Sequence, residues 1–119
     1  MVLVDTSVWI AHFRKSDSKL KHLLMNADVA CHDFIIGELA CGHLKDRDEI
    51  IILLKSLPRT EKAEHIEILH FIDSHQLMGL GLGLVDIHIL ASAVLSRTPL
   101  WTLDKNLQKV SRKLDVFHK

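Results

Sequence analysis

Tyrosine is absent from this 119-residue chain, and its aromatic side chains are limited to two tryptophans and four phenylalanines. Proteins that bind single-stranded nucleic acid by stacking its bases need a richer aromatic surface. Net charge is absent too, since 15 Lys and Arg balance 15 Asp and Glu when the nine histidines are neutral. If the chain binds nucleic acid, we therefore expect local basic clusters and phosphate contacts to dominate.

Long apolar runs are also missing. The longest candidate, residues 79–95, is interrupted by Asp86 and His88 and falls short of the roughly 20 residues that a membrane-spanning helix needs. The amino terminus reaches Asp5 after a short apolar run, without the basic segment and apolar region of a signal peptide. We therefore expect a cytoplasmic protein that does not enter a membrane.

Cysteine is scarce, with only Cys31 and Cys41 present. Hydrophobic residues make up 48% of the chain, which is enough to fill a core without a disulfide. Reduced thiols agree with the expected cytoplasmic setting. A zinc site is disfavoured, because the cysteines do not form a CxxC pair and Cys41 and His43 would point to opposite faces of a helix.

Apolar runs alternate with helical patterns along the chain. Residues 1–4 form a continuous apolar run typical of a strand buried on both faces, and further strands are predicted near 29–31, 100–103 and 116–117. Helical patterns cover 8–13, 20–24, 35–44, 46–57, 64–77, 87–95 and 107–114, with Asp33 as the predicted N-cap of the third. We expect one three-layer α/β/α domain over residues 1–119, with a mostly parallel central sheet.

Two of the apolar runs end in an aspartate, Asp5 in one case and Asp104 in the other. Ligands of open α/β sheets bind outside the carboxyl ends of the strands, so both acids are expected at the functional edge. Asp86 lies near the start of a later helix and joins them if that helix begins at the same edge. Glu38 is the only acid in its apolar helix and has small neighbours, which predicts a close-packed carboxylate.

Four clustered carboxylates need a cation. Two carboxylates 4 Å apart repel by roughly 4 kcal/mol at an effective dielectric constant near 20, so four cannot all stay ionised unaided. Oxygen ligands favour Mg²⁺, with Mn²⁺ as a substitute. Such a site suits phosphodiester hydrolysis, because the cation activates water and neutralises charge on the phosphate.

Four segments of the sequence carry a family resemblance. Its elements are Val-Asp-Thr-Ser-Val-Trp at 4–9, the helix around Glu38, Asp86 before Ala-Ser-Ala at 91–93, and Leu-Trp-Thr-Leu-Asp at 100–104. In this order and context, the chain resembles PIN-domain ribonucleases. More narrowly, it is similar to the VapC toxins of bacterial and archaeal type II toxin–antitoxin pairs, over essentially its whole length.

Carried over residue by residue, the resemblance makes four carboxylates the catalytic and metal-binding groups, namely Asp5, Glu38, Asp86 and Asp104. Thr6 and Thr102 match hydroxyl positions that support this cluster. Many relatives have another acid two residues after the fourth, followed by an aromatic residue, where this chain has Asn106 and Leu107. Asn106 can still orient a water or bind a metal through its amide oxygen, so one ion or two remain open.

The resemblance further implies Mg²⁺-dependent endonucleolytic cleavage of RNA, with a metal-activated water as the nucleophile. It also implies a homodimer and a cognate antitoxin protein that blocks the site. The main rival is a PIN-like fold without activity that serves as a protein-binding or RNA-binding module.

Other interpretations of the acids stay open. Asp5 and Asp104 can simply cap the helices that follow them, and the two helical acids can be solvated. A strand followed by aspartate also occurs in haloacid dehalogenase-class phosphatases and in receiver domains. The phosphatases need a second aspartate where this chain has Ser7, and the receiver domains need an acid pair that Thr6 interrupts.

Two groups of basic residues are candidates for RNA contacts, although charge runs are more often solvated faces. One group lies near Asp5 and comprises Arg14, Lys15, Lys19 and Lys21, and the other lies on or beside the last helix and comprises Lys105, Lys109, Arg112 and Lys113. Histidines 65, 70 and 75 are five residues apart, which spreads them around a helix and predicts surface positions.

Overall fold

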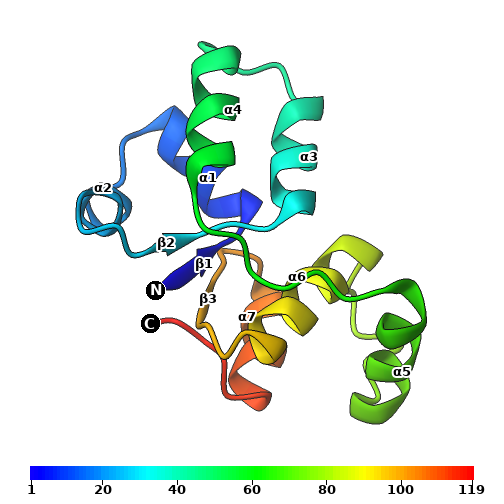
Figure 1. Cartoon of the computed structure of the whole chain (residues 1–119). Helices are drawn as coiled ribbons and strands as arrows, with labels where there is room; N and C mark the ends of the chain where they lie inside the picture. Colours follow the sequence, from blue (N-terminus) through cyan, green and yellow to red (C-terminus); the bar gives the residue numbers. More distant parts are fainter.

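Three short parallel strands form the centre of the molecule (Figure 1). This computed structural model describes all 119 residues, and its strands are β1 (Val2–Val4), β2 (Val29–Ala30) and β3 (Leu100–Trp101). β1 lies in the middle, with Val2 opposite Val29 on one side and Leu3 opposite Leu100 on the other. All of β1 is buried, which is why its sequence is continuously apolar rather than alternating.

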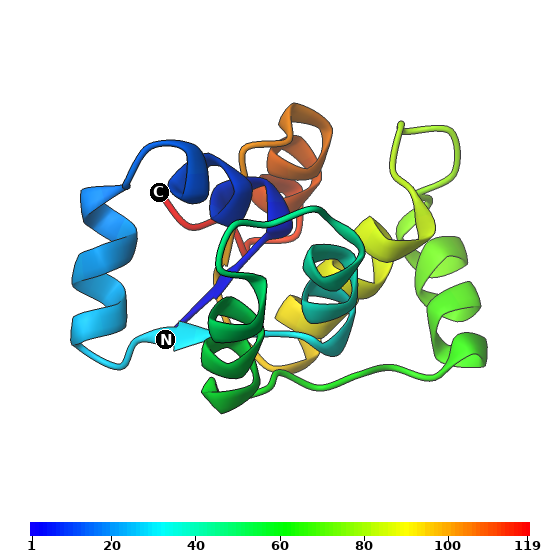
Figure 2. The same cartoon turned by 90° about the horizontal axis from the view of Figure 1, so that it is seen from above.

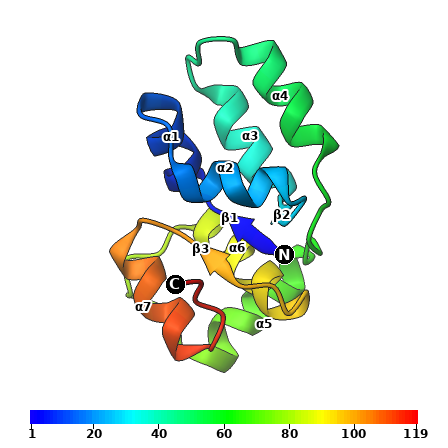
Figure 3. The same ribbon diagram turned by 90° about the vertical axis from the view of Figure 1, so that its left-hand side faces the viewer.

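Seven helices surround this sheet. They are α1 (Thr6–Arg14), α2 (Ser18–Met25), α3 (Asp33–Cys41), α4 (Arg47–Ser56), α5 (His65–His75), α6 (Leu84–Leu95) and α7 (Lys105–Lys113). Figures 1 and 3 show α1, α3 and α4 on one side of the strands and α6 and α7 on the other, with α5 outside α6. The predicted α/β fold with helices on both faces of a parallel sheet is therefore confirmed.

Helix α6 is the most deeply buried of the helices. Every residue from 87 to 93 is buried, because α3, α5 and α7 all contact this helix. Figure 2 shows α6 running through the middle of the molecule, with α5 along its outer side. A helix that is covered on several sides has no solvent-exposed stripe. Its packing against three other helices holds the first turn, which contains Asp86, in a defined place.

Several predicted boundaries were wrong. His32, rather than Asp33, is the N-cap of α3, because its Nδ1 accepts a hydrogen bond from the Phe34 N–H at 2.9 Å. The same helix was expected to reach residue 44 but ends at Cys41, where the backbone becomes extended. β3 stops at residue 101 instead of 103, and the expected strand at 116–117 is reduced to a single bridge between Leu100 and Phe117.

Asp33 has a different task from the predicted cap. Its carboxylate pairs with Arg59 at 3.0 Å and with Lys62 at 3.2 Å, and these hydrogen bonds lower its pKa.

Both cysteines are free thiols, and burial raises the pKa of Cys31 to about 11. No helix has the length and apolar character needed to cross a membrane.

His32 is a fully buried cap. Its Nε2 has no hydrogen-bond partner, and the ring of Phe34 lies 5.2 Å from its ring and 4.6 Å from that of His88. Burial lowers the pKa of His32 from 6.5 to about 4. The neutral ring is also what the cap requires, because a protonated Nδ1 could not accept the Phe34 N–H.

Lowering the pH should therefore destabilise the protein through His32. The unfolded chain takes up the proton near pH 6.5, whereas the folded pKa is about 4, so stability is intact above about pH 6.5 and falls as the pH drops towards 4. The loss from this group is at most about 3 kcal/mol. Urea unfolding at a series of pH values measures it.

The control is His32→Asn, which keeps a side-chain acceptor at the N-cap but cannot titrate. Its free energy of unfolding should depend less steeply on pH between 6.5 and 4. The other groups with shifted pKa values, among them His88, His118 and Asp33, contribute to the slope that remains. Equal slopes in the two proteins would show that His32 is not the titrating group.

Candidate active site

Asp5 follows the last residue of β1 and is only 6% exposed. Its Oδ2 accepts hydrogen bonds from Ser7 Oγ at 2.8 Å and from Thr102 Oγ1 at 2.7 Å. Thr102 is fully buried and directly follows β3. The ends of two neighbouring parallel strands are thus joined through one carboxylate. Asp5 occupies the N-cap position of α1 but makes no capping hydrogen bond with its side chain.

Ser7, which the sequence analysis does not place among the site residues, belongs to the same hydrogen-bond network. Its hydroxyl lies 3.3 Å from Thr102 Oγ1 and accepts a hydrogen bond from the Leu103 N–H at 3.0 Å. Gln108 was also missed, and its Nε2 donates to the Thr102 carbonyl at 2.8 Å. The position of Ser7 two residues after a strand-terminal aspartate was an available signal, whereas nothing in the sequence marked Gln108.

Asp104 caps α7 and is exposed to solvent. Its Oδ1 accepts the Leu107 N–H at 2.9 Å, and its own N–H donates to Thr102 Oγ1 at 3.1 Å. Asp104 therefore caps α7, which does not exclude a role in the site, whereas the Asp5 side chain makes no capping hydrogen bond. Through Thr102, both strand-terminal acids belong to one hydrogen-bond network.

Glu38 reaches the same region from α3. Its Oε1 accepts a hydrogen bond from Thr6 Oγ1 at 2.8 Å, which connects α3 to the first residue of α1. The prediction of a close-packed carboxylate was wrong, because Glu38 is exposed. Helix α3 buries Ile35 and Leu39 instead, and Glu38 is left at the solvent side next to Thr6.

Asp86 lies in the first turn of α6 and is partly buried. Its Oδ2 accepts the Gly83 N–H at 3.1 Å. Burial raises the pKa of Asp86, and the negative charges of Asp5 and Asp104 raise it further, against the opposing effect of the Gly83 hydrogen bond. Helix α6 therefore begins at the edge where both strands end, and three of the four predicted acids act on one another electrostatically.

Comparison with known proteins agrees with this arrangement. The family model of the PIN domain matches residues 2–113. Two curated proteins named Ribonuclease VapC32, from Mycobacterium tuberculosis strains CDC 1551 / Oshkosh and ATCC 25618 / H37Rv, are each 43% identical to the chain over 109 residues. The match covers 91% of this chain and 88% of each relative. The chain belongs to the PIN-domain family, within the VapC ribonucleases.

Membership of the VapC ribonucleases confirms the resemblance stated from the sequence and excludes the phosphatase and receiver-domain interpretations. The roles of individual residues stay predictions. Asn106 makes no hydrogen bond to any of the four acids. It lies against Gly81, where an added Cβ would come within 2.6 Å of its Nδ2. Gly81 has φ +76°, which L side chains rarely adopt, so the loop before α6 needs glycine beside Asn106.

The donor set of this VapC chain suits a hard divalent cation, because every candidate ligand is a carboxylate or amide oxygen. As the side chains stand, no three acidic, histidine or cysteine groups lie close enough together to hold one ion. Three of the acids instead accept hydrogen bonds from nearby donors: Thr6 Oγ1 donates to Glu38, the Gly83 N–H to Asp86 and the Leu107 N–H to Asp104. The chemistry of the donor set fits a hard cation.

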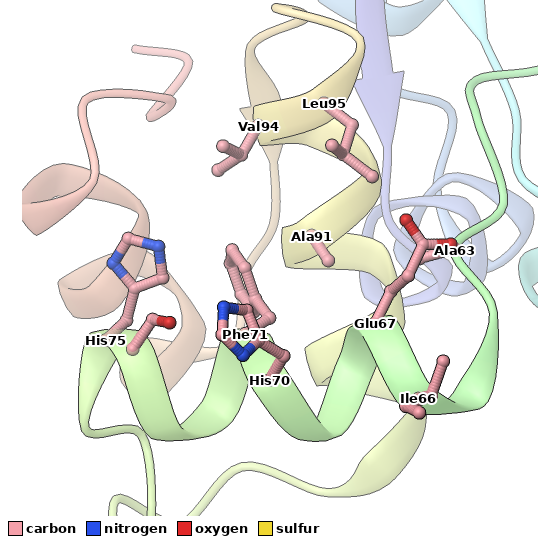
Figure 4. A pocket seen from close by; sticks show the side chains of 10 residues that line it. Ala63, Ile66, Glu67, His70, Phe71, His75, Ala91, Val94 and Leu95 are labelled. Carbon is pink, nitrogen blue, oxygen red and sulfur yellow. The ribbon is translucent and has the colours of Figure 1, made fainter.

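A pocket of about 540 Å³ lies elsewhere, between α5 and α6 (Figure 4). Phe71 points from α5 towards α6, and His70 and His75 lie along the same helix. None of the four acids lines this pocket. None of them lines the pocket of about 570 Å³ beside α4 either, so a search for large hollows would not have found the acids of this VapC chain.

Thr102→Val should destabilise the metal-free protein by about 1–3 kcal/mol, because the buried Asp5 carboxylate loses a donor. Thr102→Ser keeps the hydroxyl and should cost clearly less. The cost of Thr102→Val should shrink in an Asp5→Ala background, where there is no carboxylate to satisfy. Urea unfolding in EDTA measures all of these differences. Equal stabilities of the Val and Ser variants would contradict this account of Thr102.

Proposed function

We propose that this VapC-family chain is an endoribonuclease that hydrolyses RNA phosphodiester bonds with the help of Mg²⁺, for which Mn²⁺ can substitute. The residues that would hold the ion are Asp5, Glu38, Asp86 and Asp104. The observation that carries the proposal is the 43% identity to Ribonuclease VapC32 over 91% of the chain, together with the hydrogen bonds that join Asp5, Thr102 and Asp104 where β1 and β3 end. Acids that repel one another at one edge form a site whose charge a cation would neutralise.

The hydroxyl groups of the chain orient two of these acids in advance. Ser7 and Thr102 fix Asp5, and Thr6 fixes Glu38. These hydrogen bonds define where the two carboxylates lie before a ligand arrives. The supporting roles of Thr6 and Thr102 rest on these contacts, whereas Asn106 would support the site through the loop at Gly81.

When bound, the cation supplies a Lewis acid that activates water and stabilises the negative charge developing on the phosphate. In the hydrolysis, the water oxygen forms a bond to phosphorus, and one P–O bond of the RNA chain breaks. The four acids bind and orient, and they contribute no covalent bond.

Family membership also supports three partners: an RNA substrate, a cognate antitoxin protein and a second copy of the chain. The exposed apolar side chains agree with protein partners. Ile52 on α4 is 69% exposed and Ile66 on α5 is 74% exposed. Apolar side chains of this size on a surface mark interaction sites when they gather in patches.

Asp5→Asn and Asp86→Asn should each reduce RNA cleavage in Mg²⁺ by roughly a hundredfold or more, because loss of one ligand carboxylate weakens stabilisation of the transition state by several kcal/mol. The measurement is cleavage of total RNA by the purified protein, with a chelator lane. Asp48→Asn is the matched control, since Asp48 is exposed and pairs only with Arg47 at 3.6 Å.

Full activity in either site variant would overturn the assignment of these acids. Cleavage that persists in the chelator would overturn the requirement for a metal. No cleavage by a wild-type protein of the mass of the chain alone, without a bound antitoxin, would favour the inactive binding module.

Mg²⁺ should also raise the melting temperature of the wild-type protein. A ligand at a hundred times its dissociation constant stabilises the folded state by about 2.7 kcal/mol. In EDTA, Asp86→Asn should melt no lower than wild type, because it removes a charge that Asp5 and Asp104 repel, and its melting temperature should respond less to Mg²⁺. Calorimetry of both proteins tests this, and identical melting of the wild type with Mg²⁺ and with EDTA would count against the site.

A further inference from the structure

Helix α7 has two opposite faces. Leu107, Val110 and Ser111 are buried, and at about 100° per residue they lie on one side of the helix. Its basic face comprises Lys105, Lys109, Arg112 and Lys113, all exposed, which fall within an arc of about 100° on the other side. The nine residues of α7 include no acid.

The cations of this basic face make no ion pair within the protein. The ion pairs of the chain join Arg47 to Asp48 and Asp33 to Arg59 and Lys62, and none involves α7. Arg112 is held by stacking over the Phe117 ring at 4.0 Å rather than by an acid. Because the chain as a whole has no net charge, this face is a local excess of positive charge.

The basic face begins next to the acids. Asp104 is the N-cap of α7, and Lys105 to Arg112 extends about 10 Å along the helix axis away from it. A cluster of carboxylates repels phosphate. An RNA chain therefore needs a neighbouring positive surface to stay close to the acids, and α7 provides one that starts where the acids end.

The second basic group, which comprises Arg14, Lys15, Lys19 and Lys21, lies farther from the acids and is less uniformly basic. It begins at the far end of α1 from Asp5, which is about 13 Å along the axis of that helix. It also contains Asp17, the N-cap of α2, whose Oδ1 accepts the Leu20 N–H at 3.0 Å. Charge and continuity with the acids both favour α7.

We propose that the basic face of α7 binds the phosphate backbone of the RNA strand whose scissile phosphate lies at the acids beside Asp104. This inference rests on the proposed function for the identity of its ligand. The exposed residues of α7 include no aromatic side chain. We therefore expect this face to bind phosphate groups through their charge and not to recognise the base sequence. Binding through this face should therefore depend steeply on salt.

The test measures binding of a fluorescein-labelled, mixed-sequence single-stranded RNA in EDTA over a series of salt concentrations. EDTA prevents metal-dependent cleavage, so that binding is measured independently of catalysis. The variant is Lys109→Gln with Lys113→Gln, and the matched control is Lys45→Gln with Lys55→Gln, which removes the same charge at exposed positions before and within α4. Lys15→Gln with Lys19→Gln tests the rival basic group.

The α7 variant should bind RNA roughly tenfold more weakly at low salt, and its plot of log affinity against log salt should be shallower by about 1.4, or about 0.7 per lost phosphate contact on a single strand. Neither other pair should show this change of slope. In Mg²⁺ the α7 variant should raise KM and leave kcat nearly unchanged. All variants should keep the wild-type melting temperature, because the substituted residues are exposed.

An unchanged affinity and slope in the α7 variant would overturn the inference. The same loss in the α4 control, a loss confined to the Lys15 and Lys19 pair, or no RNA binding by the wild type would do so as well. Wild-type cleavage without any effect of α7 on binding would leave the proposed function standing and remove only this surface. Weaker binding by the α7 variant of a protein that never cleaves would uphold the surface and remove the proposed nuclease.

Discussion

A carboxylate buried at the end of a central strand is costly unless polar groups satisfy it. Asp5 is in this position, and the hydroxyls of Ser7 and Thr102 satisfy it at 2.8 and 2.7 Å. Since Thr102 follows β3 and also accepts the Asp104 N–H, the same interaction aligns two strand ends and the start of α7. This junction sets the positions of Asp5 and Asp104 relative to the sheet.

The other acids approach the junction from helices, each held by a donor close to it. Thr6 connects Glu38 to α1, and the Gly83 N–H holds Asp86 at the start of α6. Each of these two carboxylates therefore has a polar partner, which for the partly buried Asp86 offsets part of the cost of taking its charge out of water. Burial raises the pKa of Asp86, and the negative charges of Asp5 and Asp104 add to this effect.

Acidic and basic side chains lie in separate places on this protein, although its net charge is zero. Acids gather where the strands end, and the exposed face of α7 carries cations without acidic partners. A polyanion meets repulsion at the first surface and attraction at the second. Their adjacency at Asp104 is what makes an RNA chain a physically reasonable ligand for a VapC-family ribonuclease of zero net charge.

The sequence by itself determined the class of fold, since apolar runs alternating with helical periods leave few alternatives to a parallel sheet covered by helices. It also marked Asp5 and Asp104, because an acid that ends a buried strand stands out locally. Contacts between distant segments were decided only by the tertiary structure. The hydroxyl of Ser7 meets Thr102 across 95 positions, and Glu38 is exposed beside Thr6 rather than packed. The local sequence pattern determines which side chains lie at the end of a strand or helix. The packing of whole elements decides which of those ends come together.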